Sequence, residues 1–232
     1  PDTLSLSGEY QNPVLAIHML GNPAQVSTPV LLEDSCGAHG AEIDGRRTGS
    51  IGHCGAFSFF FSHHITTGEG GAITTNDPHL ADACRSIRAH GWVRERSDRQ
   101  WWENEYAHID PRFLFASMGY NLRMTEVSGA IGLHQVDRIE GFVQQRRDNH
   151  QEWCAMVSAL NVPIRVYPEA ANTRHAGFAF PMMLDENAPM TRAQLCAELE
   201  SRGIQTRPIS GANLAIQPAF ERVPGVSIRG DL

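Results

Sequence analysis

Three side chains within residues 33–71 have types suited to holding and using a charged heterocyclic ring: Asp34, Ser58 and His63. Asp34 ends an apolar run, so its carboxylate can pair with a protonated ring nitrogen or simply cap the following turn. Ser58 can donate to a phosphate, or it is an ordinary strand hydroxyl. The imidazole of His63 can move protons near neutral pH, or it is a polar residue at the end of a strand.

A pyridine ring paired with Asp34 would stay cationic and accept electrons, which is the pairing that pyridoxal phosphate requires. Glycines at 68, 70 and 71 permit positive φ and close backbone approach, although a plain tight turn needs the same residues. All nineteen basic residues are Arg, and the chain contains no Lys. Schiff-base catalysis by a lysine of this polypeptide is therefore excluded.

The elements that must position these residues are those of an α/β sheet. Nearly continuous apolar runs predict buried strands, and a 3.6-residue period predicts helices. We expect strands at 14–18, 30–34, 57–61 and 72–75, a helix over 78–90, and a long helix or kinked pair from Thr125 to about Leu160. Residues 92–118 are expected to form a long irregular connection, a type of segment that is often functional.

A second, smaller α/β unit is expected near the C-terminus. It comprises a strand over 177–184, a helix over 192–202 with a capping box at Thr191, and a strand over 204–209. The sequence thus predicts a cofactor-binding domain over 1–150 and a smaller domain over 151–232. Only residues 19–29 separate the first two strands, too few for a helical crossover, so we expect a partial sequence with a missing segment.

The composition limits which binding partners and which cellular compartment we expect for this protein. The formal net charge is −7, which argues against a nucleic-acid partner. No apolar stretch of ~18 residues occurs, so no membrane partner is expected. The five Cys lack the spacing of a disulfide framework or a zinc site, which predicts a cytoplasmic protein without a metal.

Several short motifs, in a common order, resemble one family: the sugar aminotransferases and dehydratases of the pyridoxal-phosphate aspartate-aminotransferase fold. The motifs are Glu33-Asp34, Gly49-Ser-Ile-Gly52, Phe57-Ser58, Thr66-Thr-Gly-Glu-Gly-Gly71, Gly119-Tyr-Asn-Leu-Arg-Met-Thr-Glu126 and Gly203-Ile-Gln-Thr-Arg-Pro208. The resemblance implies fold type I, a mostly parallel sheet flanked by helices with a smaller C-terminal α/β domain. It implies that Asp34 and Ser58 bind the cofactor.

His63 occupies the position where most members of that family carry the cofactor-binding Lys. This resembles the branch of 3-dehydratases that act on nucleoside-diphosphate 4-keto-6-deoxyhexoses in deoxysugar and lipopolysaccharide biosynthesis. The resemblance implies that pyridoxamine phosphate condenses with the C4 ketone, that His63 removes a proton from the cofactor, and that the C3 hydroxyl leaves as water. Glutamate would then regenerate the amine form of pyridoxal 5′-phosphate.

The same resemblance implies further site residues and a homodimer. Asn121 would reach the cofactor phosphate of the neighbouring subunit, and Arg207 and Asn213 would contact the substrate. No Cys occurs in residues 91–117, so the sequence resembles the branch members that lack an iron-sulfur cluster. Gly37 departs from the family, because aminotransferases place Gln there and the dehydratases an acid.

Two alternatives remain open. The first is a nucleotide-sugar aminotransferase whose Lys lies in a segment outside this sequence. The second is a non-catalytic protein with a cofactor-binding fold, which would bind pyridoxamine phosphate without turning over any 4-keto sugar.

Overall fold

The computed structural model describes residues 5–211 and 217–221, and these fall into two compact units. Unit 1 holds Pro1–Val162 and Val166–Phe180, and unit 2 holds Pro163–Arg165 and Pro181–Leu232. The domain boundary near residue 150 stays a prediction. In the described part of the chain, no helix is both long and apolar enough to cross a membrane.

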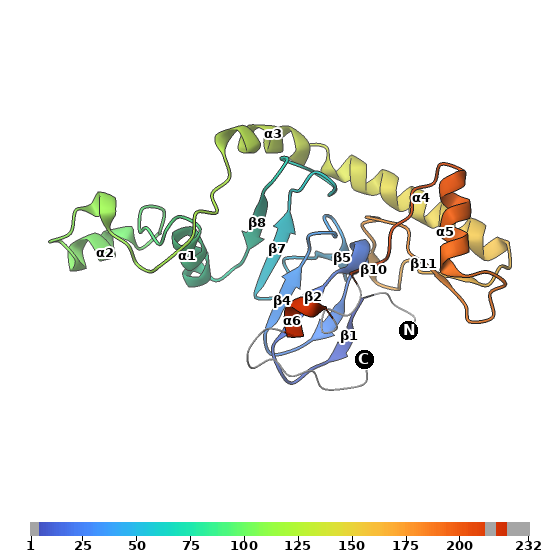
Figure 1. The fold of residues 1–232 in the computed structure, drawn as a ribbon. Helices are drawn as coiled ribbons and strands as arrows, with labels where there is room; N and C mark the ends of the chain where they lie inside the picture. The colour runs from blue at the N-terminus through green and yellow to red at the C-terminus, as the bar shows by residue number, and fades with distance from the viewer. Residues whose placement is uncertain (1–4, 212–216, 222–232) are drawn as a thin grey trace. The chain divides into compact units, whose positions relative to one another are not determined.

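The largest sheet of unit 1 has four strands in the order β2-β4-β7-β8 (Figure 1). These strands are β2 (Val14–Ile17), β4 (Leu31–Asp34), β7 (Cys54–Ser58) and β8 (Gly71–Thr74). The first three run parallel, and β8 is antiparallel to β7. The predicted strands at 14–18, 30–34 and 72–75 are confirmed to within one residue.

The strand predicted over 57–61 is wrong in its position, because β7 ends at Ser58. Beyond it the chain turns: the amide of Phe59 donates to the carbonyl of Gly70, and the amide of Thr67 donates to the carbonyl of Phe59. These bonds close a loop over residues 59–70, so the three phenylalanines do not continue the strand. His63 lies in this loop, which keeps it near the carboxyl end of β7.

Only one face of this sheet is fully covered in the described residues. Ala16, Leu31 and Glu33 are buried, and Ala24 joins the cluster around Ala16 and Leu31. The alternate residues on the other face are exposed; they include Leu15, Ile17, Leu32 and Ile73. The expectation of strands buried on both faces therefore holds for one face only.

Unit 1 also contains two small sheets. Strands β1 (Ser7–Glu9) and β3 (Gln25–Ser27) pair in parallel, and β10 (Thr173–Arg174), β5 (Glu42–Ile43) and β6 (Arg46–Arg47) form an antiparallel sheet. The link from β2 to β4 contains the 3-10 turn η1 (Met19–Gly21) and β3. As expected from its length, it includes no α-helix.

The helices of unit 1 largely follow the sequence pattern. They are α1 (Pro78–Ile87), α2 (Arg99–Glu105), the 3-10 helix η2 (Pro111–Phe113), α3 (Glu126–Val136) and α4 (Ile139–Ala159). The predicted helix over 78–90 is confirmed but ends three residues early, and the kinked pair is confirmed with its break at residues 137–138. Helix α2 was not predicted, since residues 92–118 show no apolar period.

Helix α4 packs on the turn that follows β4. Its Val143 is fully buried, and a Cβ built at Gly40 would lie 3.1 Å from a methyl carbon of Val143. One turn later, the Arg146 guanidinium donates to the carbonyl of Phe178 at 3.2 Å. Helix α4 thereby holds residues 176–178 against the turns that carry the candidate site.

Unit 2 contains β9 (Ile164–Val166, of which Val166 falls in unit 1), β11 (Met182–Leu184), α5 (Arg192–Ser201) and α6 (Pro218–Glu221). Strands β9 and β11 pair. The helix over 192–202 and its capping box between Thr191 and Gln194 are confirmed.

Two strand predictions near the C-terminus are corrected. The strand over 177–184 is reduced to β11, because Gly177 adopts a φ of +61° and contacts the backbone of Arg146 instead of pairing. Residues 204–209 form no strand, because Ile204 donates back to Leu199 at the end of α5. In each case a contact with a helix replaces the expected strand pairing.

Candidate functional site

Asp34 and Ser58 lie at the carboxyl ends of two neighbouring parallel strands. Asp34 of β4 is in register with Ala56 of β7, and Ser58 follows two residues later. Since side chains alternate along a strand, Asp34, Ala56 and Ser58 share one face of the sheet. The structure therefore brings the two predicted cofactor ligands together at one edge, where parallel α/β sheets commonly bind ligands.

Both side chains retain capacity for a ligand. The Asp34 carboxylate accepts from the amide of Cys36 at 3.0 Å and from the neighbouring Cys36 thiol, and its remaining lone pairs are available to a ligand. The Ser58 hydroxyl accepts from the amide of Phe60 at 3.3 Å, so its own proton remains available to donate. The Cys36 thiol beside Asp34 is an unsuitable nucleophile, because burial and the neighbouring carboxylate raise its pKa to about 12.

His63 lies in the loop after β7 and packs against aromatic rings. Its ring centroid is 5.4 Å from that of Phe178, 6.2 Å from that of Phe60 and 6.4 Å from that of His39. The side chain is half-buried, and its Nδ1 is buried without a hydrogen-bond partner in the described part of the chain. The predicted base thus sits in a mainly apolar wall with one nitrogen directed inward.

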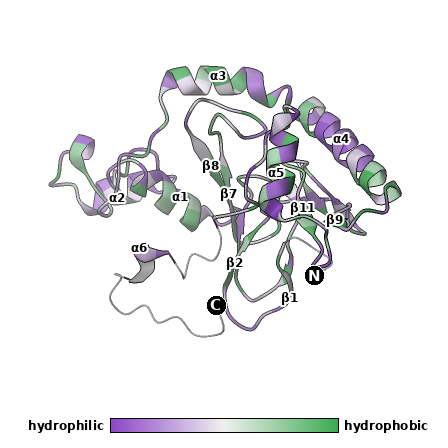
Figure 2. Ribbon diagram, turned by 45° about the vertical axis from the view of Figure 1, so that its right-hand side comes forward, coloured by the Kyte–Doolittle hydropathy of each residue, from purple (hydrophilic) through white to green (hydrophobic). Residues whose placement is uncertain are grey.

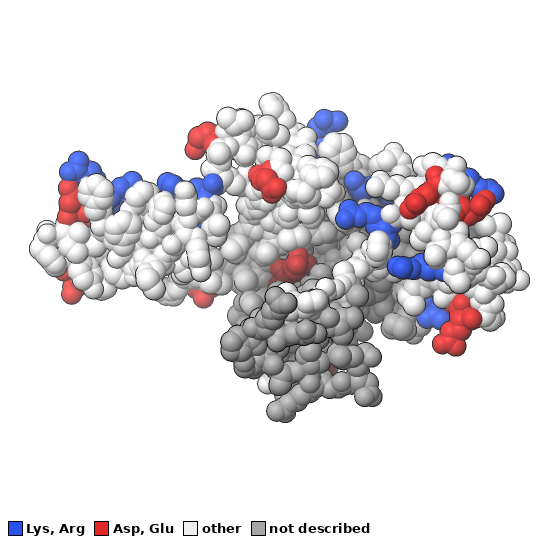
Figure 3. Space-filling view, in the orientation of Figure 1, with Lys and Arg blue, Asp and Glu red and all other residues white. Residues whose placement is uncertain are grey.

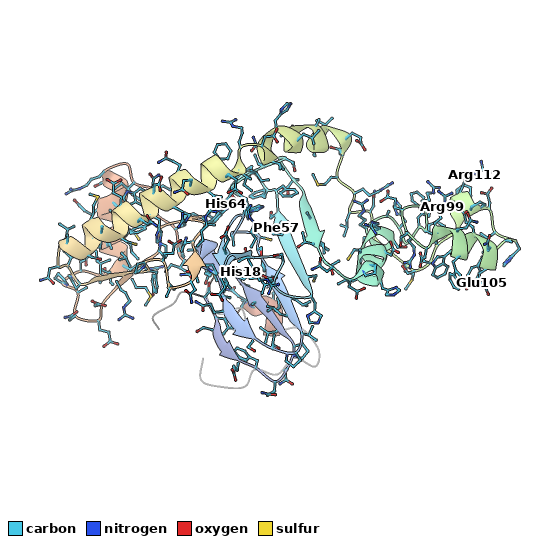
Figure 4. The ribbon with its side chains drawn as sticks, turned by 180° about the vertical axis from the view of Figure 1, so that it is seen from behind. His18, Phe57, His64, Arg99, Glu105 and Arg112 are labelled. Atoms are coloured by element: carbon cyan, nitrogen blue, oxygen red, sulfur yellow. The ribbon has the colours of Figure 1, made fainter. Side chains whose placement is uncertain are left out.

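Next to it, His64 has a structural role. It is 4 % exposed, and its Nε2 lies 2.9 Å from the carbonyl oxygen of Ala176. Burial lowers the pKa of His64 to about 4, so the ring is neutral at pH 7. Figure 4 shows His64 and Phe57 in the same region of the molecule, around the end of β7.

His39 completes this histidine cluster and has no assigned role in the sequence prediction. Its ring lies 5.4 Å from that of His64 and 5.2 Å from that of Phe57, and the side chain is 3 % exposed. Both of its ring nitrogens are buried, and the backbone of Cys36 is the polar group nearest to the ring. Burial, with His64 and His63 nearby, lowers its pKa to about 3.

Glu33, directly before Asp34, clamps the loop between β4 and β7. Its buried carboxylate accepts from the amides of Gly49, Ile51 and Gly52 at 2.7–2.8 Å. It also lies 3.0 Å from Nε2 of His18, whose Nδ1 accepts from the amide of Ala24. That second bond fixes the tautomer: His18 is neutral with its proton on Nε2, and it donates to Glu33.

The pKa of Glu33 is lowered although the side chain is buried. Burial alone would raise it, but the bond from His18 and the three backbone amides outweigh this effect. Gly49-Ser-Ile-Gly52, one of the motifs that carry the family resemblance, is therefore a loop built around one carboxylate. It fixes the start of β7, and through it the position of Ser58.

Within a single copy of the chain, Asn121 does not lie at this site. It is exposed, forms a bridge to Ala89, and accepts from the guanidinium of Arg123 at 3.1 Å. It belongs to the segment from α1 to α3, where Arg side chains lie beside acidic ones (Figure 3). Its role at a phosphate stays a prediction.

Neither of the two expected substrate residues is among the described residues of unit 1. Arg207 is exposed in unit 2, and Asn213 lies outside the described residues. The structure contains no group of His, Cys, Asp or Glu that could hold a metal ion within residues 5–211 and 217–221. Both substrate assignments stay predictions.

Sequence reasoning missed two residues of this region. His39 and Glu33 stand inside the motif that carries Asp34, yet neither could be given a role. The available signal for Glu33 was its type, since a carboxylate in a buried strand needs several donors. The donors themselves come from residues 49–52, and only the fold shows that they face it.

Comparisons with known proteins agree on the family. The DegT/DnrJ/EryC1/StrS aminotransferase family matches residues 9–228. GDP-4-keto-6-deoxy-D-mannose 3-dehydratase of Yersinia pseudotuberculosis is 36 % identical over 217 residues, covering 88 % of this chain and 54 % of the relative. The dTDP-4-dehydro-2,6-dideoxy-D-glucose 3-dehydratase of Saccharopolyspora spinosa is 33 % identical, covering 93 % and 50 %. The chain spans about half the length of the curated relatives it matches.

Solved structures show the same fold. GDP-4-keto-6-deoxymannose 3-dehydratase with bound GDP-perosamine superposes with a TM-score of 0.76 at 30 % identity, covering 91 % of this chain and 57 % of that one. The Escherichia coli enzyme with bound hydrated pyridoxal phosphate gives 0.75 at 31 %, covering 88 % and 55 %. The expected fold class, that of the pyridoxal-phosphate aminotransferases, is confirmed. The chain belongs to the DegT/DnrJ/EryC1/StrS aminotransferase family.

Proposed function

We propose that this protein removes the C3 oxygen of a nucleoside-diphosphate 4-keto-6-deoxyhexose, using pyridoxamine phosphate, with His63 as the base. The observation that carries the proposal is a carboxylate and a hydroxyl at one sheet edge, followed by an imidazole, in a chain without lysine. Relatives named as 3-dehydratases of nucleotide sugars support the substrate class.

The residues present suit the cofactor's ring and phosphate, and they favour a cofactor held without a covalent link. The Asp34 carboxylate can accept from a pyridinium N–H, and the Ser58 hydroxyl can donate to a phosphate oxygen. When bound, the cofactor would supply an electron-accepting ring conjugated to the sugar carbon. Gly37 offers no side chain to that ring; a Cβ there would lie 3.8 Å from the ring of Phe178.

In the proposed reaction, Asp34, His63 and the aromatic rings beside His63 each have a separate role. Asp34 orients the ring and keeps its nitrogen protonated, because a nearby anion favours the cation. His63 accepts a proton and can return one to the departing hydroxyl, since an imidazole changes charge near neutral pH. The rings of Phe60 and Phe178 beside His63 shield that transfer from bulk water.

Incubating the protein with pyridoxal phosphate, glutamate and a panel of 4-keto-6-deoxy nucleotide sugars tests this function. Mass spectrometry should detect a product that has lost one oxygen, and 2-oxoglutarate should accumulate. An amino-sugar product would identify an aminotransferase instead. Cofactor binding without turnover of any sugar in the panel would indicate a non-catalytic protein, and either result would overturn the proposal.

A homodimer is part of this proposal, supported by an apolar surface on α3 and the residues before it. No residue of α3 is buried in the described structure. The ribbon of α3 carries hydrophobic residues in Figure 2. The exposed apolar residues of this helix continue those before it; together they include Met118, Tyr120, Leu122, Val127, Ile131, Leu133 and Val136. Asn121 lies within this surface, so a partner covering it would receive Asn121.

Sedimentation analysis of the protein should give twice the monomer mass, and a charge on this surface, Leu133→Glu, should shift it toward the monomer. A monomeric parent protein would contradict the dimer.

A cytoplasmic location likewise belongs to the proposal, supported by five cysteines that are all free thiols.

A further inference from the structure

The backbone of Phe178 is held between α4 and the turn that follows β2. Its amide donates to the carbonyl of Leu20 at 3.2 Å, and its carbonyl accepts from the guanidinium of Arg146 at 3.2 Å. The preceding Gly177 packs so closely on α4 that a Cβ built there would lie 2.8 Å from the carbonyl oxygen of Arg146. The side chain of Phe178 therefore starts from a fixed backbone position.

From this position the Phe178 ring lies beside both histidines of the loop after β7. Its centroid is 5.4 Å from that of His63, with 36° between the ring planes, and 5.6 Å from that of His64. His64 is itself fixed, because its Nε2 lies 2.9 Å from the carbonyl oxygen of Ala176. Of the ring contacts that His63 makes in the described residues, the one with Phe178 is the closest.

Packing has to orient the His63 imidazole from its inner side. Its Nδ1 is buried without a hydrogen-bond partner within residues 5–211 and 217–221. A ring that no bond holds on that side can change its rotamer unless neighbouring atoms fill the space around it. The Phe178 ring, on its fixed backbone, is the nearest ring that can do so.

The absence of a side chain at Gly37 leaves room for the Phe178 ring. A Cβ built on Gly37 would lie 3.8 Å from two carbon atoms of that ring, which is ordinary van der Waals contact. The further atoms of a longer side chain would compete with the ring for the same space. Gly37 follows Asp34 by three residues, so the ring of Phe178 lies between the turn after Asp34 and His63.

We propose that Phe178 is a positioning residue for His63, and that glycine at position 37 gives the Phe178 ring the space for this role. The ring, fixed through its backbone by Leu20 and α4, restricts the imidazole to one orientation. This inference rests on the function proposed above, because only that function makes His63 the base. The packing itself depends on the fold alone.

Proton NMR of the protein without cofactor or substrate tests the packing. We expect nuclear Overhauser contacts between the ring protons of His63 and Phe178 in the parent protein. Phe178→Leu removes the aromatic ring, so the ring-current shift of the His63 protons should be lost. Phe178→Tyr keeps a ring at this partly exposed position and should retain the shift. A parent protein without contacts between the two rings would overturn the proposal.

Phe180→Leu is the matched control for Phe178→Leu. Phe180 is also partly buried, and its ring packs on those of His150 and Trp153, at 5.5 and 5.3 Å between centroids. The same atoms are removed two residues away, so the signals of His63 should stay as in the parent protein. Equal changes at His63 in both variants would indicate a general loosening of the structure and would overturn the proposal.

Two variants test the role of Gly37. Gly37→Ala adds only the Cβ and should leave the contacts between His63 and Phe178 intact. Gly37→Gln adds atoms that compete with the Phe178 ring, so these contacts should weaken. Contacts of parent strength in the Gly37→Gln protein would overturn the role assigned to position 37.

Turnover gives a second readout. Phe178→Leu should lower kcat about ten- to hundredfold with little change in KM, because a misplacement of about 1 Å can cost a reaction about 100-fold. Phe178→Tyr should recover most of this loss, and Phe180→Leu should turn over normally. A Phe178→Leu protein with the parent kcat would overturn the proposal even if the dehydratase function is correct. If the NMR results are as expected but no 4-keto sugar reacts with the parent protein, the proposed function fails and the packing of His63 stands.

Discussion

Replacing Glu33 with Gln is expected to lower the free energy of unfolding by about 3–5 kcal/mol, the range typical of breaking a buried charge network. The carboxylate accepts from three backbone amides and from His18. An amide of the same shape has one oxygen and an NH₂ group, which would face an N–H donor. Urea unfolding followed by circular dichroism measures the loss.

Glu42→Gln is the control, because Glu42 is only partly buried and pairs with Arg174 at 3.2 Å. Its unfolding free energy should change by about 1 kcal/mol or less. A Glu33→Gln protein as stable as the Glu42→Gln protein would show that the clamp is not needed.

The effect of Glu33 should depend on pH in a defined direction. Its folded-state pKa lies below the ordinary 4.5, so the ionised form is stabilised by folding. The stability difference between parent and variant is therefore full above pH 4.5. It should shrink as the pH falls through the folded pKa, where the parent carboxylate is also neutral.

Replacing His63 with Asn should reduce dehydration at least 100-fold while cofactor binding is retained. A positioned general base contributes about 10²–10⁴ to a rate, and an amide cannot accept a proton at neutral pH. Asp34 and Ser58, which hold the cofactor in the proposal, are unchanged. Product formation and cofactor absorbance, measured on the same samples, separate the two effects.

His79→Asn is the matched change for this test, since His79 is an exposed residue of α1. It should turn over normally. Full activity of the His63→Asn protein would refute the assignment of the base. A stable covalent adduct between the parent protein and pyridoxal phosphate after borohydride treatment would refute the lysine-free mode of binding.

Local sequence signals predicted the elements with strong periods or caps. The helices around residues 78–87 and 192–201 have a distinct apolar period or capping box, and both occur as expected. The apolar runs of β2 and β4 also gave the right strands. They could not show that Leu15 and Ile17 stay exposed on one face, because a continuous apolar run looks the same whether one face or two are covered.

The site was predictable only to the extent that its residues follow strands. Asp34 and Ser58 end neighbouring strands, so their convergence follows from a parallel sheet. The relation of His39 to His63 depends on how two turns fold back, and the acceptor for His64 comes from residue 176, held in place by α4. No local pattern encodes such contacts, which is why the packing of His39 beside His63 and His64 emerged only from the structure.

The contact between Gly49 and Gly55 limits how this region can open. A Cβ built at Gly55 would lie 2.3 Å from Cα of Gly49, so the two backbones touch, and Thr74 of β8 donates its hydroxyl to the Gly49 carbonyl. The loop therefore cannot lift without breaking its contacts with both β7 and β8. Amide hydrogens of β4, β7 and this loop should accordingly exchange with solvent as one cooperative unit, and fraying at this edge would release all of them together.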